Sequence, residues 1–312
     1  MEAAKIVLNQ VEVMFFLVVI GLILVKKRII SHSTITDISN TLLYLVVPVL
    51  LIKTYTREVK YNELICLMYA FLISIFFHVL GILIANIFIK RSNDEYKIDR
   101  LSIIYSNCGF MAFPILSVVL GEKGIFYGSA FVAVFNIFLW THGMKVLTDN
   151  KKLNIKRAVF NPGCIAVMLG IMTYVLQLKY PPVIVDAIDF IAGLNTPLAM
   201  FVVGGMLSDI KWKKFLDIQL IIVTFMRMLC LPIAGVLIIK ILKIYIISLD
   251  MASVCMAITL CAACPVAASI TLLPASLGIE ASRGAKSIAF TTICSIITLP
   301  FVTFIIQVVF SG

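Results

Sequence analysis

The chain has 312 residues, of which 62% are hydrophobic and 13% charged, and its mean hydropathy is +1.09. This apolar share exceeds that of a soluble domain and predicts an all-α polytopic protein of the cell membrane, with the lipid bilayer as its surroundings. The net charge of +10 comes from lysines and arginines beside apolar segments; without a basic face or a nucleic-acid fold motif, it indicates membrane topology and no nucleic-acid partner.

Ten apolar segments follow one another along the chain, and each has about the length of a helix that crosses a bilayer. Five lie in a first half, residues 1–147, and five in a second half, residues 158–312, with a basic cytoplasmic linker, 148–157, between them. We predict helical spans at Ile6–Val25, Ile38–Ile52, Leu64–Ile89, Leu101–Gly121, Gly124–Met144, Ala158–Leu178, Phe190–Ser208, Ile218–Ile239, Met251–Leu277 and Ser287–Phe310.

Charge and glycine patterns describe the spans of the first half. The basic run Lys26–Arg28 follows the first span, whereas a cleaved signal peptide carries its positive charge in front, so we expect a retained helix. A loop of mixed charge, residues 90–100, is expected after the third span. The fifth span contains Gly124 and Gly128, whose spacing allows close contact between helices.

The fourth span is apolar enough to cross a bilayer, yet it carries Asn107, Cys108, Gly109 and Pro114 near its centre. Proline removes a backbone donor and glycine weakens a helix, so backbone groups are left there without intrahelical partners. Lipid cannot satisfy these groups, and they must face protein or a water-filled cavity. We therefore predict an interrupted helix.

The second half repeats this organisation. The ninth span carries Cys264, Pro265, Val266 and Ser269 near its centre, so the interrupted spans fall fourth in each half. The second and seventh spans also share a short motif, Asn40-Thr41 in one and Asn195-Thr196 in the other. Because five spans are an odd number, the second half enters the membrane from the opposite side, which predicts an inverted repeat.

Loop charges indicate the orientation of these spans. Of the 26 Lys and Arg residues, 17 lie in the loops on one side of the predicted membrane, 8 lie on the side of the two termini, and Arg227 lies within a span. Positive residues concentrate on the cytoplasmic side of membrane proteins. We therefore predict a multi-pass protein with both termini outside the cytoplasm.

A spaced set of motifs runs through almost the whole chain: Asn107 to Pro114, Phe135 to Phe138, Asn161-Pro162, Pro265 to Ser269, and Thr298-Leu299-Pro300. This set resembles the auxin efflux carrier family, which includes the plant PIN auxin exporters and bacterial permeases assigned to malate or malonate. The plant exporters have a long loop between their halves, whereas this chain has only residues 145–157 there.

The resemblance implies a five-plus-five inverted fold in which helices 4 and 9 cross, and secondary transport of a small organic anion by an elevator-like movement. Helices 1, 2, 6 and 7 would form the scaffold, and helices 3–5 and 8–10 the transport domain. Family members form dimers through the scaffold, so a homodimer is an expectation for this chain.

Two interrupted helices that meet in the middle of the membrane bring helix N-termini together, and each N-terminus is equivalent to about half a positive charge. Such ends hold a carboxylate without a fixed cation. Asn107 would donate from its amide, Cys264 and Ser269 would line the second helix, and Asn136 would orient the pocket. For Asn107 the alternative is a bond between helices that only stabilises packing. The predicted substrate-binding residues are Asn107, Cys108, Gly109, Pro114, Asn136, Cys264, Pro265, Val266 and Ser269.

His78 and Arg227 lie inside the third and eighth predicted spans, where ionisable residues are costly and are often functional. His78 can couple transport to protons, or it can bond a carbonyl in a helix contact. Arg227 can balance the charge of a bound anion, or its side chain can reach toward an interface. We predict no cofactor and no metal, with coupling to protons or to the membrane potential.

Two other function classes stay open. A sodium-coupled organic-anion symporter of the bile-acid-carrier type would need oxygen ligands for sodium near the crossing, and the sequence offers no acidic residue there. A membrane-embedded enzyme or sensor would need a nucleophile with a base or a set of metal ligands, and His32, His78 and His142 lie on different segments. Cys261 and Cys264 have the spacing of a redox pair but lie in an apolar span, so we interpret them as packing residues. We predict that the chain is not an enzyme.

Overall fold

The structure, a computed structural model, describes residues 2–58, 60–90, 94–149, 156, 159–208, 216–248, 250–280 and 282–310. Across these residues the fold is helical, and its only strand-like pairing is an isolated antiparallel bridge between Ser106 and Val266. Most of the predicted linker 148–157 lies outside the described residues.

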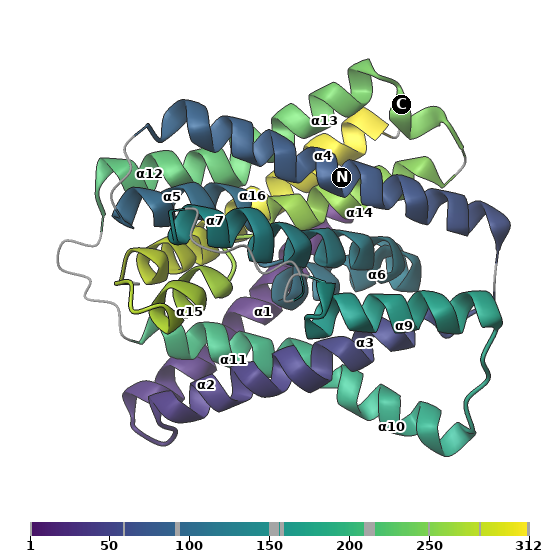
Figure 1. Cartoon of the computed structure of the whole chain (residues 1–312), viewed down its shortest axis with the longest axis horizontal. Coiled ribbons are helices and arrows are strands. Elements are labelled where there is room, and N and C mark those ends of the chain that lie inside the picture. Colours follow the sequence, from purple (N-terminus) through teal and green to yellow (C-terminus); the bar gives the residue numbers. More distant parts are fainter. Residues whose placement is uncertain are drawn as a thin grey trace.

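The helices of the first half, in chain order (Figure 1), are α1 (Glu2–Lys26), α2 (His32–Thr41), η1 (Leu42–Val46), α3 (Val47–Tyr55), α4 (Tyr61–Phe88), α5 (Asp94–Ile104), η2 (Cys108–Ala112), α6 (Phe113–Phe138), η3 (Leu139–Gly143) and α7 (Met144–Leu147). Those of the second half are α9 (Pro162–Leu176), α10 (Pro182–Gly193), α11 (Asn195–Leu207), α12 (Ile218–Phe225), η4 (Met226–Cys230), α13 (Leu231–Ile241), η5 (Ile244–Ile246), α14 (Met251–Ala263), α15 (Ser269–Ser276) and α16 (Ser282–Phe310). Segments η1 to η4 are π-helical, and η5 is a 3₁₀ turn.

Seven stretches of the described residues are long and apolar enough to cross a membrane: Glu2–Lys26, His32–Tyr55, Tyr61–Phe88, Cys108–Leu147, Pro182–Leu207, Ile218–Ile241 and Ser282–Phe310. Pro162–Leu176 and Met251–Ala263 are shorter apolar helices. These stretches make the protein a multi-pass membrane protein, whereas the count of ten spans stays a prediction.

The stretch Cys108–Leu147 contains parts of two predicted spans, because the chain breaks its helical path inside α6. Gly121 has φ 64° and ψ −152°, a conformation that residues with a Cβ rarely adopt. Beyond this break, a Cβ on Gly124 would lie 2.7 Å from the carbonyl oxygen of Leu116, so the two arms pack closely. The absence of a side chain at Gly124 and Gly128 therefore permits a helical hairpin, as their spacing predicts.

One prediction for this region is wrong. The predicted loop at 90–100 is helical from Asp94 onward, because α5 begins there. Asp94 and Glu95 occupy the first turn, where carboxylates interact favourably with the helix N-terminus. The mixed charge of this segment therefore marks a helix start rather than a loop.

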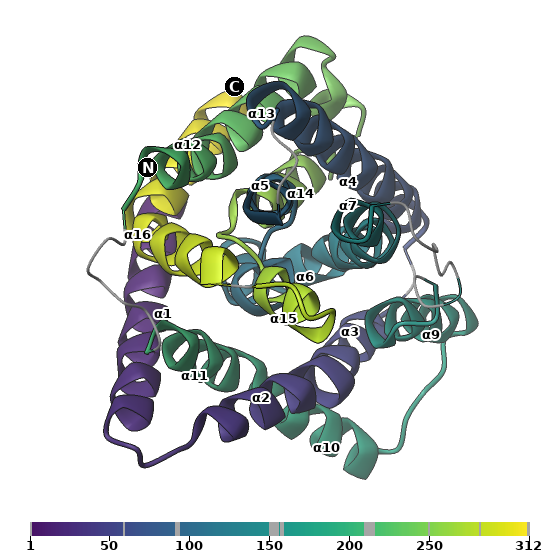
Figure 2. The same cartoon turned by 60° about the vertical axis from the view of Figure 1, so that its left-hand side comes forward.

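A panel along one side of the molecule consists of α1, α2, α3, α9, α10 and α11 (Figure 2). In this panel α1 packs against α11, and α3 packs against α9 and α10. Glycines bring the helices together: a Cβ on Gly204 would lie 2.1 Å from the carbonyl oxygen of Val18, and one on Gly21 would lie 2.7 Å from that of Phe201. Close backbone approach through small residues is the usual way in which membrane helices associate.

The remaining helices form a bundle beside this panel. The short helices α5 and α14 lie in its middle, surrounded by α4, α6, α12–α13 and α16 (Figure 2). The last residues of α5 and α14 are therefore far from solvent, and the interrupted spans meet inside protein rather than in lipid.

A cluster of buried charges ties the start of α5 to two neighbouring helices. Arg283 of α16 bonds both carboxylate oxygens of Asp99, with Nε–Oδ1 and Nη2–Oδ2 distances of 2.7 and 3.2 Å, and also bonds Asp217. Burial raises the pKa of Asp99, and Arg283 partly offsets this. At Asp217 burial also raises the pKa, but the bonds from Arg283 and the Leu220 amide outweigh it, so the net shift is downward. The cluster fixes α5, α12 and α16 relative to one another.

Candidate functional site

The two interrupted helices meet at extended segments. Helix α5 ends at Ile104 and η2 begins at Cys108, while α14 ends at Ala263 and α15 begins at Ser269. Between the segments, the Asn107 amide donates to the Pro265 carbonyl at 2.7 Å, and the Ala267 amide donates to the Tyr105 carbonyl at 3.1 Å. The chains thus satisfy part of each other's freed backbone. We call residues 105–107 and 264–268 the crossing.

A cavity of about 420 Å³ lies where the crossing faces α2 and η1. Five of the predicted site residues line it: Asn107, Cys108, Gly109, Asn136 and Ser269. No described residue of its wall is charged, and aromatic side chains from Phe110, Phe135 and Trp140 make up part of the wall. The cavity therefore combines a polar end at the crossing with an apolar body.

The polar end of the cavity offers hydrogen-bond donors. The helical arms that begin at η2 and α15 start at the cavity, and a helix N-terminus is equivalent to about half a positive charge. Some of the first amides are already bonded: Cys108 donates to the Ser106 carbonyl at 2.8 Å and Ile270 to the Ala267 carbonyl at 3.0 Å. The Asn107 side chain is buried, and its Nδ2 has no hydrogen-bond partner in the described part of the chain. By contrast, Asn136 Nδ2 donates to the Val132 carbonyl at 2.8 Å within its own helix. Asn107 is thus free to bind a ligand oxygen, and so are the hydroxyls of Ser106 and Ser269, which line the same cavity and have no partner among the described residues.

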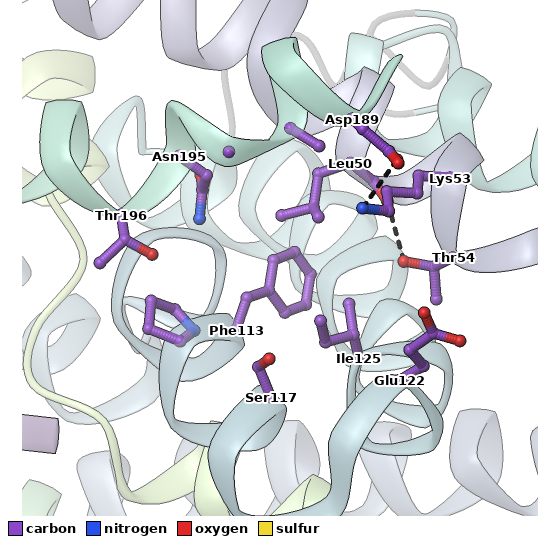
Figure 3. Close-up of a pocket in the computed structure, with 13 residues that line it drawn as sticks. Leu50, Lys53, Thr54, Phe113, Ser117, Glu122, Ile125, Asp189, Asn195 and Thr196 are labelled. Atoms are coloured by element: carbon purple, nitrogen blue, oxygen red, sulfur yellow. Dashed lines mark hydrogen bonds and ion pairs between the residues drawn. The ribbon is translucent and has the colours of Figure 1, made fainter. Parts of the chain in front are cut away.

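The other predicted site residues lie outside this cavity. Cys264, Pro265 and Val266 form the far side of the crossing, where their backbones bond neighbouring segments, as Val266 does when it donates to Thr291 Oγ1 at 3.1 Å. Pro114 lines a second cavity, of about 270 Å³ (Figure 3). The interruption precedes Pro114, which lies six residues into the helical arm that begins at Cys108, just after the π-helical segment η2.

The second cavity lies toward the other end of the same helices (Figure 3). It is lined by Leu50 and Thr54, late in the stretch His32–Tyr55, whereas Asn40 of that stretch lines the first cavity. Lys53 and Asp189 form an ion pair of 2.8 Å at this second cavity. Each cavity thus lies between the α1–α2–α3–α9–α10–α11 panel and one arm of the crossing region.

The repeated Asn-Thr motif connects the two cavities. Asn40 lines the first, and Asn195 and Thr196 line the second (Figure 3). Asn195 is buried, and its Oδ1 has no hydrogen-bond partner among the described residues. The motif that relates the two halves in sequence therefore supplies an asparagine to each of the two cavities.

A family model described as "Membrane transport protein" matches the chain at residues 6–157 and 146–303, which together span nearly all of it. The chain belongs to this family, the auxin efflux carriers. The family consists of membrane transporters and not of enzymes, which confirms the prediction that the chain is not an enzyme. A comparison with curated proteins found no match.

In this auxin efflux carrier, His78 lies in an aromatic cage rather than in the cavity. Its Nδ1 is 2.8 Å from the Ser74 carbonyl, one turn earlier in α4. Its ring lies 4.8 Å from the ring of Phe131 and 5.1 Å from that of Phe138, measured between centroids. The imidazole is 1% exposed, and Nε2 has no partner in the described chain. The observed contacts are those of a packed helix interface.

Arg227 is likewise buried in the carrier and does not line either cavity. Its guanidinium bonds backbone carbonyls at the ends of α5 and α14. Among the described residues, no carboxylate lies within ion-pair distance of it. The side chain therefore reaches inward to the crossing, not outward to an interface.

Four π-helical segments occur in the described part of the carrier, and all of them adjoin the crossing or the first cavity. Segments η1, η2 and η3 contribute Tyr44, Cys108 and Trp140 to the cavity wall, while η4 carries Arg227. A π turn inserts one residue into a helix and is frequent at functional sites. Sequence reasoning missed Tyr44 and Trp140, because no motif marks such a turn; Asn40 had a signal, the repeated Asn-Thr pair.

Proposed function

We propose that this carrier is a secondary transporter that moves a small organic anion, a carboxylate, across the cytoplasmic membrane by alternating access at the crossing. The observation that carries the proposal is the 420 Å³ cavity that contains the starts of two helical arms and the unpartnered amide of Asn107. Partial positive charge at helix N-termini favours an anion, and an uncharged wall lets the anion leave without separation of an ion pair.

The walls of the cavity favour one kind of carboxylate. Phe110, Phe135 and Trp140 supply an apolar surface, and no lysine or arginine is present among the lining residues to meet a second carboxylate. An anion with one carboxylate and an aromatic body, similar to auxin, fits this distribution better than a dicarboxylate does.

The two cavities support alternating access. The first is lined by the crossing and the second by α6, and each has one wall from the α1–α2–α3–α9–α10–α11 panel. In the proposed movement this panel is the scaffold, and α4–α7 with α12–α16 shift against it, so that the crossing opens to one cavity at a time. The loop charges support an orientation with both termini outside the cytoplasm. The proposed homodimer forms through the panel.

Uptake into proteoliposomes tests the proposal. The panel of substrates contains indole-3-acetate, benzoate, malate and malonate, and pH and sodium gradients are imposed separately. We expect accumulation of a monocarboxylate that depends on the pH gradient or the membrane potential. No uptake of any carboxylate would refute the proposal, and a strict requirement for sodium would favour the symporter of the bile-acid-carrier type.

The Asn107→Ala variant is expected to bind the transported carboxylate about tenfold more weakly or worse, because a hydrogen bond to a charged group is lost. The measurement is the substrate concentration at half-maximal uptake. Asn62→Ala, at an exposed position of α4, is the matched control and should behave as the wild type. Unchanged affinity in a folded Asn107→Ala protein would remove this side chain from the site.

The His78→Gln variant is expected to keep the wild-type response of uptake to an imposed pH gradient. The imidazole is caged by aromatic rings and bonds only the Ser74 carbonyl, so it has no contact with the cavity through which a proton could be exchanged with the anion. Initial uptake rates with and without the gradient give the comparison. Loss of the pH response in this variant would assign proton coupling to His78 instead.

A further inference from the structure

Arg227 places its whole guanidinium against backbone oxygens of the interrupted helices. Nη1 bonds the carbonyls of Ile103 and Ile104 at 3.0 and 3.4 Å, at the end of α5. Nη2 bonds the Ala262 carbonyl at 2.6 Å, and both Nε and Nη2 bond the Cys264 carbonyl at 3.1 Å, at the end of α14. One side chain therefore caps the C-terminal ends of both half-helices.

These ends have an electrostatic consequence for the cavity. The last carbonyls of a helix lack intrahelical donors and are equivalent to about half a negative charge at each C-terminus. Two such ends meet at the crossing, immediately behind the N-termini that face the cavity. Without compensation, they would cancel much of the positive potential that the N-termini supply.

The charge of Arg227 is not neutralised by an acidic side chain of the described chain. No described carboxylate pairs with it, in contrast to Arg283, which lies between Asp99 and Asp217. Removing a guanidinium from water is costly unless its hydrogen bonds are restored, and here the carbonyls restore them. The net result at the crossing is a full positive charge against two partial negative ones.

We propose that Arg227 is a positioning residue that sets the positive potential of the cavity from behind the crossing, and thereby its preference for anions, without touching the anion. This deepens the proposed function and rests on it for the identity of the cargo. It also explains how a cavity without a charged residue in its described wall can select a carboxylate.

The substitution Gly109→Cys introduces a thiol that probes the electrostatic potential of the cavity. Gly109 lines the cavity, and a Cβ there would have no atom within 4 Å, so Gly109→Cys fits without a shift. The rate of its modification is measured with two thiol reagents of opposite charge, 2-sulfonatoethyl and 2-(trimethylammonium)ethyl methanethiosulfonate. The parent chain with Gly109 gives the background from the eight native cysteines. The ratio of the anionic to the cationic rate reads the sign of the local potential.

In the Gly109→Cys background, Arg227→Gln is expected to lower this ratio by about tenfold or more, because a nearby charge acts oppositely on the two reagents. Arg227→Lys keeps the charge and should stay within about twofold of the starting ratio. Lys240→Gln removes an exposed charge near the end of α13 and should leave the ratio unchanged.

The ratio of the two modification rates distinguishes an effect of the Arg227 charge from an effect of Arg227 on the fold. If Arg227 only stabilises the fold, its loss changes both rates by the same factor and the ratio stays constant, which would overturn the proposal. If Arg227→Gln does not fold, Arg227→Met, which also removes the charge at similar side-chain length, decides: a lowered ratio supports the proposal and an unchanged ratio refutes it. These rates require no substrate, so failure of carboxylate uptake would refute the proposed function while leaving this measurement intact.

Discussion

The Gly204→Ala variant is expected to lose most of its folded protein. A Cβ at this position would lie 2.1 Å from the Val18 carbonyl oxygen and 2.8 Å from the Leu22 amide nitrogen, both of them backbone atoms of α1. Backbone cannot rotate away as a side chain can, so α1 and α11 must separate. Overpacking typically costs about 1–3 kcal/mol and occasionally more, and we expect the upper end of that range.

The matched control is Gly193→Ala, at the end of α10 in the same panel. A Cβ on Gly193 would meet no atom within 4 Å. Both substitutions replace a helical glycine by the best helix former, so propensity favours both variants equally and the difference between them isolates the contact with α1. The melting temperature of each variant is measured by thermal unfolding in detergent, with size-exclusion chromatography as the readout of the protein that stays folded. Equal melting temperatures would mean that α1 and α11 do not approach as closely as described.

The Arg283→Met variant is expected to be destabilised by about 3–5 kcal/mol, because it leaves the Asp99 carboxylate buried without a partner. Asp99 is 1% exposed and receives two bonds from Arg283. The double variant Asp99→Asn with Arg283→Met removes both charges and should recover a large part of the loss. Unfolding free energies in a denaturant series measure the coupling between the two sites.

Lys97→Met provides the control on the same helix, α5. Lys97 is itself mostly buried, but it pairs with Asp94 and Asp149, whose side chains are 64% and 72% exposed. Because water screens these exposed carboxylates, we expect the pairs to contribute about 1 kcal/mol or less. A loss at Lys97 as large as that at Arg283 would show that charge anywhere on α5 matters, and that the buried cluster has no special role.

The sequence predicted that interrupted helices form the site, but it did not predict where the first interruption lies. Proline with glycine in the fourth span, and proline in the ninth, indicated interrupted helices, and the structure interrupts both. It places the first break at residues 105–107 rather than at Pro114, because pairing with Pro265 fixes the break there, whereas Pro114 lies within the helical arm that begins at η2. That pairing joins residues more than 150 positions apart, which local pattern cannot predict.

The direction of these side chains also could not be predicted from the sequence. The position of Arg227 in an apolar span indicated a buried or a snorkelling charge, but only the arrangement of α5 and α14 around it decides between them. The same holds for Asn136, whose amide is used within its own helix. Asn40 and Asn195 are the opposite case, because the shared Asn-Thr motif relates them in sequence before any contact is known.

The π-helical segments have a consequence for the tolerance of this protein to changes in length. Each holds one residue more than a regular turn, so deleting a single residue from Met226–Cys230 would let the helix close to an ordinary α-helix. Because the extra residue is absorbed within the turn, the helix beyond the deletion would keep nearly the same orientation, whereas a deletion from a regular α-helical stretch would turn everything beyond it by about 100°. The π-helical segments are therefore the places in these helices where a relative can lack one residue and still present the same side chains to the middle of the membrane.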